Sequence, residues 1–115
     1  MEAANRRINP RYLVSLYTEQ IERETTPPCI LNMSEQGFLL RGDLCAGSGG
    51  VVRAAFRVHP SSGESRVTTR GTVMHATARN GEYEFGVRID SFGSEQEESA
   101  YKAYVGELAS KAVAL

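Results

Sequence analysis

Two stretches in the middle of the chain alternate apolar and polar residues, and this alternation constrains the fold more than any other feature. Only an extended strand brings every second residue onto one face, so both stretches predict strands with one buried and one solvent-facing side. The apolar members, which we expect to be buried, are Tyr83, Phe85, Val87 and Ile89 in one stretch and Val52, Ala54, Phe56 and Val58 in the other.

Turn-forming residues separate these strands from their neighbours. Asn80-Gly81 lies between the strand expected at 73–77 and the strand at 83–89, and this dipeptide suits the positive φ angles of a tight primed hairpin turn. Pro60-Ser61-Ser62-Gly63 is a second hairpin-type break, and 42–50 is a glycine-rich loop. Shorter β-prone stretches at 12–17, 29–33 and 38–41 bring the expected number of strands to about six.

The end of the chain changes period. Its apolar residues recur at steps of three and four, which predicts an amphipathic helix over about 94–114. Ser94 with Glu97 three residues later has the spacing of a capping box, and Gly106 costs such a helix about 1 kcal/mol relative to alanine. The predicted fold is therefore all-β with one helix: a six-stranded antiparallel β-barrel followed by a C-terminal α-helix that covers it.

Length and composition narrow the class of protein. A chain of 115 residues with 41% hydrophobic residues predicts one globular domain that needs no disulfide or metal to fold. Cys29 and Cys45 are too few and too far apart for a zinc cluster or a redox pair, which favours idle thiols in a reducing compartment. No apolar run could span a membrane and the first thirty residues are charged, so we expect a cytoplasmic protein without membrane insertion.

The N-terminal segment carries the first candidate binding residues, Arg6, Arg7 and Arg11, with Pro10 among them. Proline discourages a helix here, so an extended arm is expected. Arginine forks match phosphate oxygens and the O6/N7 edge of guanine bidentately. Taken alone, the segment is more typical of a solvated basic leader, and the net charge of −1 argues against a general affinity for DNA or RNA.

The second candidate is the segment Asn32-Met33-Ser34-Glu35-Gln36-Gly37, which lies between two short apolar stretches and should form the turn that joins two strands. Asn32 offers a carbonyl acceptor and an amide donor, Ser34 offers a hydroxyl, and Gly37 permits a close backbone approach. Asparagine, serine and glycine are also common in ordinary turns, so this segment by itself is not specific.

Together the two segments resemble the PilZ domain, the bacterial receptor domain for cyclic di-GMP. The RxxxR motif of that family matches Arg7 to Arg11, and its [D/N]xSxxG motif matches Asn32 to Gly37. Later in the chain, Gly86-Val87-Arg88-Ile89 resembles the strand that closes PilZ barrels. The resemblance spans essentially the whole chain, and the order of the motifs agrees with the strands and helix inferred from periodicity.

The resemblance implies a role for each matching residue. Residues 1–11 would be a flexible ligand-binding arm that orders on binding, and 12–115 a single barrel domain. Arg7 and Arg11 would bind phosphate and guanine, while Asn32, Ser34 and Gly37 would form the cradle for a guanine. Arg6, directly before RxxxR, resembles family variants that take up two stacked, intercalated ligands. Asn32 departs from the aspartate that other members carry, because its carbonyl accepts a hydrogen bond without charge.

No constellation of residues predicts catalysis. His59 and His75 have no second ligand at metal-binding spacing, and Gly47 to Gly50 lacks the GK[ST] of a phosphate loop. We therefore expect a non-enzymatic receptor without a cofactor, which binds cyclic di-GMP and relays the signal to an unidentified effector protein by a conformational change. Two alternatives remain: a small barrel that binds single-stranded nucleic acid, and a PilZ-like adaptor that has lost its ligand.

Overall fold

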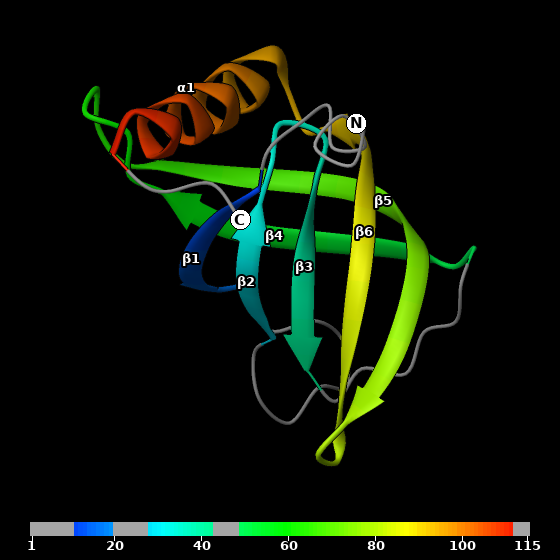
Figure 1. The fold of residues 1–115 in the computed structure, drawn as a ribbon. Coiled ribbons are helices and arrows are strands. Elements are labelled where there is room, and N and C mark those ends of the chain that lie inside the picture. The colour runs from blue at the N-terminus through cyan, green and yellow to red at the C-terminus, as the bar shows by residue number, and fades with distance from the viewer. Residues whose placement is uncertain (1–10, 20–27, 43–48, 112–115) are drawn as a thin grey trace, which may run out of the picture.

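The computed structural model describes residues 11–19, 28–42 and 49–111, which form six strands and one helix (Figure 1). The strands are β1 (Tyr12–Tyr17), β2 (Cys29–Met33), β3 (Gly37–Gly42), β4 (Val51–Val58), β5 (Ser65–Arg79) and β6 (Glu82–Phe92), and the helix is α1 (Glu95–Lys111). The six predicted strands and the C-terminal helix are confirmed. The last residues of the predicted helix and most of the glycine-rich loop lie outside the described residues.

All six strands belong to one sheet in the order β1-β2-β3-β6-β5-β4, and every pairing is antiparallel. The sheet curls into a half-barrel, as the chain pattern predicted (Figure 1). Its two edge strands approach one another just after β1, where the Glu19 amide donates to the Ala55 carbonyl at 2.7 Å. Because β6 lies between β3 and β5, it joins the N-terminal half of the sheet to the β4–β5 half.

The core lies between the concave face of this sheet and the helix. The alternating residues of β4 point inward as expected, and Phe56 is 1% exposed. Its ring makes edge-on contacts with Phe38 from β3 and with Tyr101 from α1, at centroid distances of 5.7 and 6.1 Å. Aromatic rings from three separate elements therefore fix the helix against the sheet.

The β5–β6 hairpin confirms one prediction and corrects another. Asn80 and Gly81 adopt φ angles of 53° and 82°, as a primed two-residue turn requires. β5 begins at Ser65, well before the predicted 73–77. Tyr83 lies on β6 opposite Ala78, near the tip of the hairpin, and is 37% exposed. The expectation that Tyr83 is buried was therefore wrong, because alternation selects a face but does not say where the core ends.

Two carboxylates attach α1 to the barrel. Ser94 caps the helix, since its Oγ accepts from the Glu97 amide at 3.1 Å. The Glu97 carboxylate turns across to β5 and accepts from the amide and the hydroxyl of Thr68, at 2.5 and 2.7 Å. Near the other end of α1, Glu107 accepts from the amide and hydroxyl of Ser61 in the β4–β5 turn. These hydrogen bonds lower the pKa of both carboxyl groups, which favours their charged forms.

Gly106 interrupts the helix without a packing reason. A Cβ atom built on it meets no other atom within 4 Å. We expect Gly106→Ala to raise the free energy of unfolding by up to about 1 kcal/mol, because alanine loses less backbone entropy in a helix and nothing obstructs its methyl group. Chemical denaturation measures this directly. A loss of stability would mean that residue 106 makes a contact absent from the described residues.

Among the described residues, no helix is long and apolar enough to span a bilayer.

Candidate functional site

The turn between β2 and β3 is a compact, internally bonded loop. The Ser34 amide donates to the Gly37 carbonyl at 2.8 Å, and the Ser34 Oγ accepts from the Gln36 amide at 3.3 Å. The Gln36 carbonyl accepts from the Ile89 amide at 2.8 Å, which ties the turn to β6. A Cβ atom at Gly37 would overlap the Val87 carbonyl. The glycine of this motif is therefore required by the close approach of β3 to β6.

Tyr101 on α1 lies directly behind this turn. Its hydroxyl is 2.7 Å from the Ser34 carbonyl and 3.2 Å from the Gly37 carbonyl, so a single buried O–H serves both ends of the turn. Burial raises the pKa of this phenol well above its usual range, which keeps it a donor. The sequence pattern identified Tyr101 only as a core residue, because nothing in helical periodicity says which backbone a phenol reaches.

Asn32 sits near the end of β2 and is 8% exposed. Its Oδ1 atom is buried and accepts no hydrogen bond within residues 11–19, 28–42 and 49–111. A buried acceptor without a partner costs about 1–3 kcal/mol, so native structures seldom leave one. This oxygen can therefore accept a hydrogen bond from an N–H group of a ligand.

A lateral row of outward-facing residues crosses the sheet at Asn32. The strand register places Leu13 beside Asn32, Asn32 beside Leu39, Leu39 beside Gly86, and Gly86 beside His75. A Cβ atom at Gly86 would collide with the imidazole of His75, so this ring lies over the glycine. The row is apolar next to Asn32 and ends in an exposed aromatic ring, which suits the face of a planar base.

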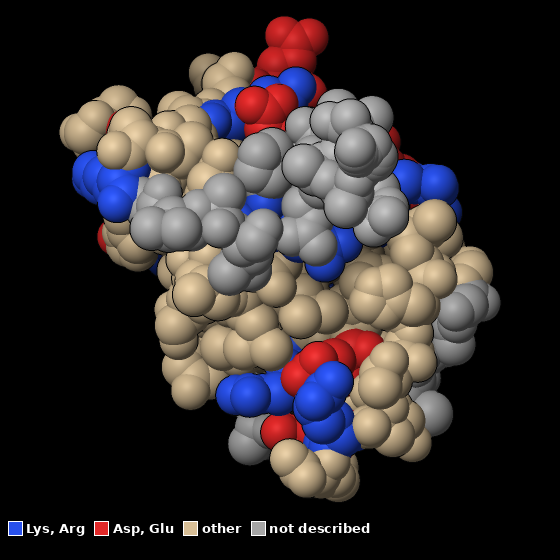
Figure 2. Space-filling model, in the orientation of Figure 1, with Lys and Arg blue, Asp and Glu red and all other residues tan. Residues whose placement is uncertain are grey.

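The row lies on a part of the surface with few charges. Figure 2 shows a largely uncharged middle on this face, with a mixed charged group near the lower end. That group lies at the far ends of β3, β5 and β6, where Arg41 pairs with Glu82 at 3.7 Å and Arg79 with Glu84 at 3.5 Å. Each ion pair is internally neutral, so the two pairs neither attract nor exclude an anion at the row.

Arg11 directly precedes β1 and is half-buried. Its neighbour Tyr12 pairs with Met33, so the antiparallel register brings Arg11 to the level of Ser34. The structure thus places Arg11, Asn32, Ser34 and Gly37 at one end of β1, β2 and β3. Arg6 and Arg7, the other two predicted arm residues, lie outside the described residues.

A groove of about 780 Å³ runs along the other side of the turn, between the turn and α1. It contains two cations, but Arg88 is 3.1 Å from Asp90 and Lys102 is 2.9 Å from Glu98. Further acidic residues, Glu35 and Glu95, line the same groove. Its charge therefore disfavours an anion, and the Arg11–Asn32 side of the turn lacks this cluster of acidic residues. No group of three potential metal ligands gathers within the part of the chain that the structure describes.

The sequence profile of the PilZ domain matches residues 5–107. This match covers most of the chain, including residues 5–11 of the arm, the β2–β3 turn and most of α1. The protein is thus a small half-barrel domain, and within its described part Arg11, Asn32, Ser34 and Gly37 lie at one end of the sheet. It belongs to the PilZ family, a family of binding and adaptor domains and not of enzymes. A search of curated proteins gives no match.

The fold also matches a solved structure, that of the Bacillus subtilis inhibitor of motility MotI/DgrA. The TM-score is 0.72 at 15% sequence identity, and the similarity covers 91% of this chain and 52% of that one. At this identity the likeness concerns the fold alone. The chain spans about half the length of MotI/DgrA, so it corresponds to a part of that protein.

Proposed function

We propose that this protein is a cyclic di-GMP receptor that relays the signal to an effector protein in the cytoplasm. The observation that carries the proposal is the Asn32 Oδ1, which is buried and has no partner among the described residues, in a chain that belongs to the PilZ family. Arg7 and Arg11 bind the phosphates and a guanine edge, and Asn32 and Ser34 hold the guanine. Arg6 adds a third guanidinium, which supports a second, stacked ligand.

The geometry supports this assignment in three ways. Arg11 reaches the level of Ser34 through the β1–β2 register. The row from Asn32 to His75 offers an apolar surface with a terminal ring. The acidic groove beside α1 leaves the opposite side of the turn as the less repulsive one for two phosphodiester charges.

Titration with cyclic di-GMP tests the proposal. We expect binding in the micromolar range or tighter, and we expect Arg11→Ala to weaken it by about tenfold to several hundredfold, because a charge-assisted hydrogen bond contributes about 1.5–3 kcal/mol. Calorimetry measures both affinities and the number of ligands per chain. Arg57→Ala is the matched control, since Arg57 is exposed on β4 and already paired with Glu64 at 3.0 Å.

Three outcomes would contradict the proposal. Absence of binding would leave an adaptor without a ligand. Equal affinity in Arg11→Ala and the parent would remove Arg11 from the site. A preference for single-stranded nucleic acid over cyclic di-GMP would support the barrel alternative. Saturation at one ligand per chain would remove only the argument from Arg6.

Asn32→Asp provides an independent test of the acceptor role. We expect cyclic di-GMP binding to persist and to tighten by up to about tenfold, because charged acceptors make stronger hydrogen bonds to guanine N–H groups. The free protein should be less stable, because a buried carboxylate without a partner is costly. Calorimetry and thermal unfolding in the absence of ligand measure the two effects. Loss of binding in Asn32→Asp would mean that Asn32 acts through its amide N–H.

A further inference from the structure

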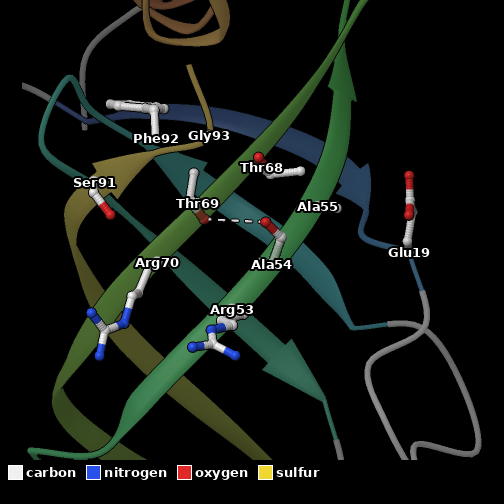
Figure 3. Close-up of a pocket in the computed structure, with 10 residues that line it drawn as sticks. All are labelled: Glu19, Arg53, Ala54, Ala55, Thr68, Thr69, Arg70, Ser91, Phe92 and Gly93. Carbon is white, nitrogen blue, oxygen red and sulfur yellow. Dashed lines mark hydrogen bonds between the residues drawn. The ribbon is translucent and has the colours of Figure 1, made fainter. Parts of the chain in front are cut away.

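A second pocket opens on the outer surface of β4, β5 and β6, away from the β2–β3 turn. Its volume is about 590 Å³, within the range of small-molecule sites. Figure 3 shows Arg53 and Arg70 at one end of the pocket and Phe92 and Gly93 toward the other. None of Arg11, Asn32, Ser34 and Gly37 lines it.

The two arginines oppose each other directly across neighbouring strands. Arg53 pairs with Arg70 in the β4–β5 register, which is the arrangement in which like charges destabilise a sheet. Neither guanidinium has a hydrogen bond or an ion pair with any residue of 11–19, 28–42 and 49–111. Asp90 interacts with Arg70 through its charge, without an ion-pair contact.

The same two strands provide an internal comparison. Four residues along β4, Arg57 and Arg66 form a second opposed pair on the same face. There each cation is neutralised: Arg57 is 3.0 Å from Glu64, and Arg66 binds Glu19 bidentately at 2.5 and 2.8 Å. Two carboxylates thus neutralise one arginine pair, whereas the other pair has no counter-ion among residues 11–19, 28–42 and 49–111.

A third hydrogen-bond donor lies next to the two arginines. The register places Ser91 of β6 beside Arg70, and Ser91 is exposed with no hydrogen bond in the described part of the chain. The acidic groups near the pocket are already engaged. Glu19 is bound to Arg66, and Asp90 accepts from Thr72 at 2.6 Å and from Arg88 at 3.1 Å.

We propose that Arg53, Arg70 and Ser91 form a binding site for a small organic phosphate ester. Two guanidinium forks and a hydroxyl match the peripheral oxygens of a phosphate dianion, whose charge offsets both arginines. Ala55 and Phe92 provide apolar surface in the same pocket for the organic group. The proposal goes beyond the cyclic di-GMP site and does not depend on it, because the two sites share none of the assigned residues.

Phenyl phosphate is a suitable probe, because it combines a phosphate dianion with a planar apolar group. An amide NMR titration of the full chain should shift signals of 53–55, 68–70 and 91–93, with saturation in the millimolar range or below. Inorganic phosphate should bind more weakly, since it lacks the ring, and phenol should not bind, since it lacks the charge. Arg53→Ala and Arg70→Ala should each weaken phenyl phosphate binding by about tenfold or more.

Two variants act as controls. Arg57→Ala should bind phenyl phosphate like the parent, because Arg57 is held by Glu64. Arg11→Ala should also bind it like the parent, which separates this pocket from the cyclic di-GMP site. Both pocket variants should fold at least as well as the parent, because each removes a like-charge contact. Phenyl phosphate should raise the thermal midpoint of the parent and not of Arg53→Ala, relative to sodium chloride at equal ionic strength.

Several results would overturn the proposal. Signal shifts confined to Arg11 and the β2–β3 turn would assign the phosphate affinity to the other site. Unchanged affinity in Arg53→Ala and Arg70→Ala would show that the pair is not the anion site. Equal affinity for inorganic and phenyl phosphate would remove the organic group from the pocket. Cyclic di-GMP titrations of Arg53→Ala test the first function separately, since we expect them to match the parent.

Discussion

Tyr101→Ala is expected to lower the free energy of unfolding by about 3–5 kcal/mol, because it removes a fully buried aromatic side chain and leaves a cavity. That is a large share of the stability of a domain this size. Tyr101→Phe should cost about 1–3 kcal/mol, because it keeps the ring but leaves the Ser34 and Gly37 carbonyls without the phenol donor. Urea denaturation of both variants separates packing from hydrogen bonding.

Tyr104→Phe is the matched control for Tyr101→Phe. Tyr104 lies on the same helix, is half-buried, and makes no side-chain hydrogen bond within the described residues. Its loss of a hydroxyl should change stability by less than about 0.5 kcal/mol. Equal effects of the two substitutions would show that the Tyr101 hydroxyl does not support the turn. We also expect Tyr101→Phe, and not Tyr104→Phe, to weaken cyclic di-GMP binding.

Gly37→Ala is expected to destabilise the protein by about 1–3 kcal/mol or more, because its methyl group would overlap the Val87 carbonyl on the neighbouring strand. Backbone cannot rotate away as a flexible side chain can, so β3 and β6 must separate. The β2–β3 turn should shift with them, and cyclic di-GMP binding should fall as well. Thermal unfolding and calorimetry measure the two losses.

Gly106→Ala is the contrasting variant, since the same chemical change there meets open space and should stabilise the protein. Opposite signs at the two positions would distinguish a packing requirement from a general effect of glycine replacement. A neutral Gly37→Ala would mean that the close approach of β3 to β6 is not needed, and that the glycine of the motif serves only the turn.

Alternation, β-propensity and turn residues together were sufficient to predict six strands but not the full length of β5, because each of these signals is local in the sequence. The Asn80-Gly81 turn was predictable for a similar reason, since its φ angles are a property of two adjacent residues. Tyr83 was mispredicted because the end of the core depends on how far β5 and β6 extend together. That extent is set by contacts distant in sequence.

The candidate site was only partly predictable. Asn32, Ser34 and Gly37 could be proposed from a short motif, because all three lie within one turn and their spacing can be read directly from the sequence. The sequence shows no metal-ligand partner for His75 and assigns it no other role, yet the register places its ring over Gly86 on the same row as Asn32. The pairing of Arg53 with Arg70 was not predictable either, because the neighbours of a residue on the adjacent strand follow only from the strand register.

The attachments of α1 also determine which movements the helix can make. Glu97, Tyr101 and Glu107 reach three different parts of the barrel: β5, the β2–β3 turn and the β4–β5 turn. At 3.6 residues per turn these side chains span about 120° of the helix circumference. Because the helix is attached at three points, it cannot rotate about its axis or slide along it unless one of these hydrogen-bonded attachments breaks. If the β2–β3 turn is displaced, we therefore expect α1 to move as one rigid body and to displace the β4–β5 turn with it.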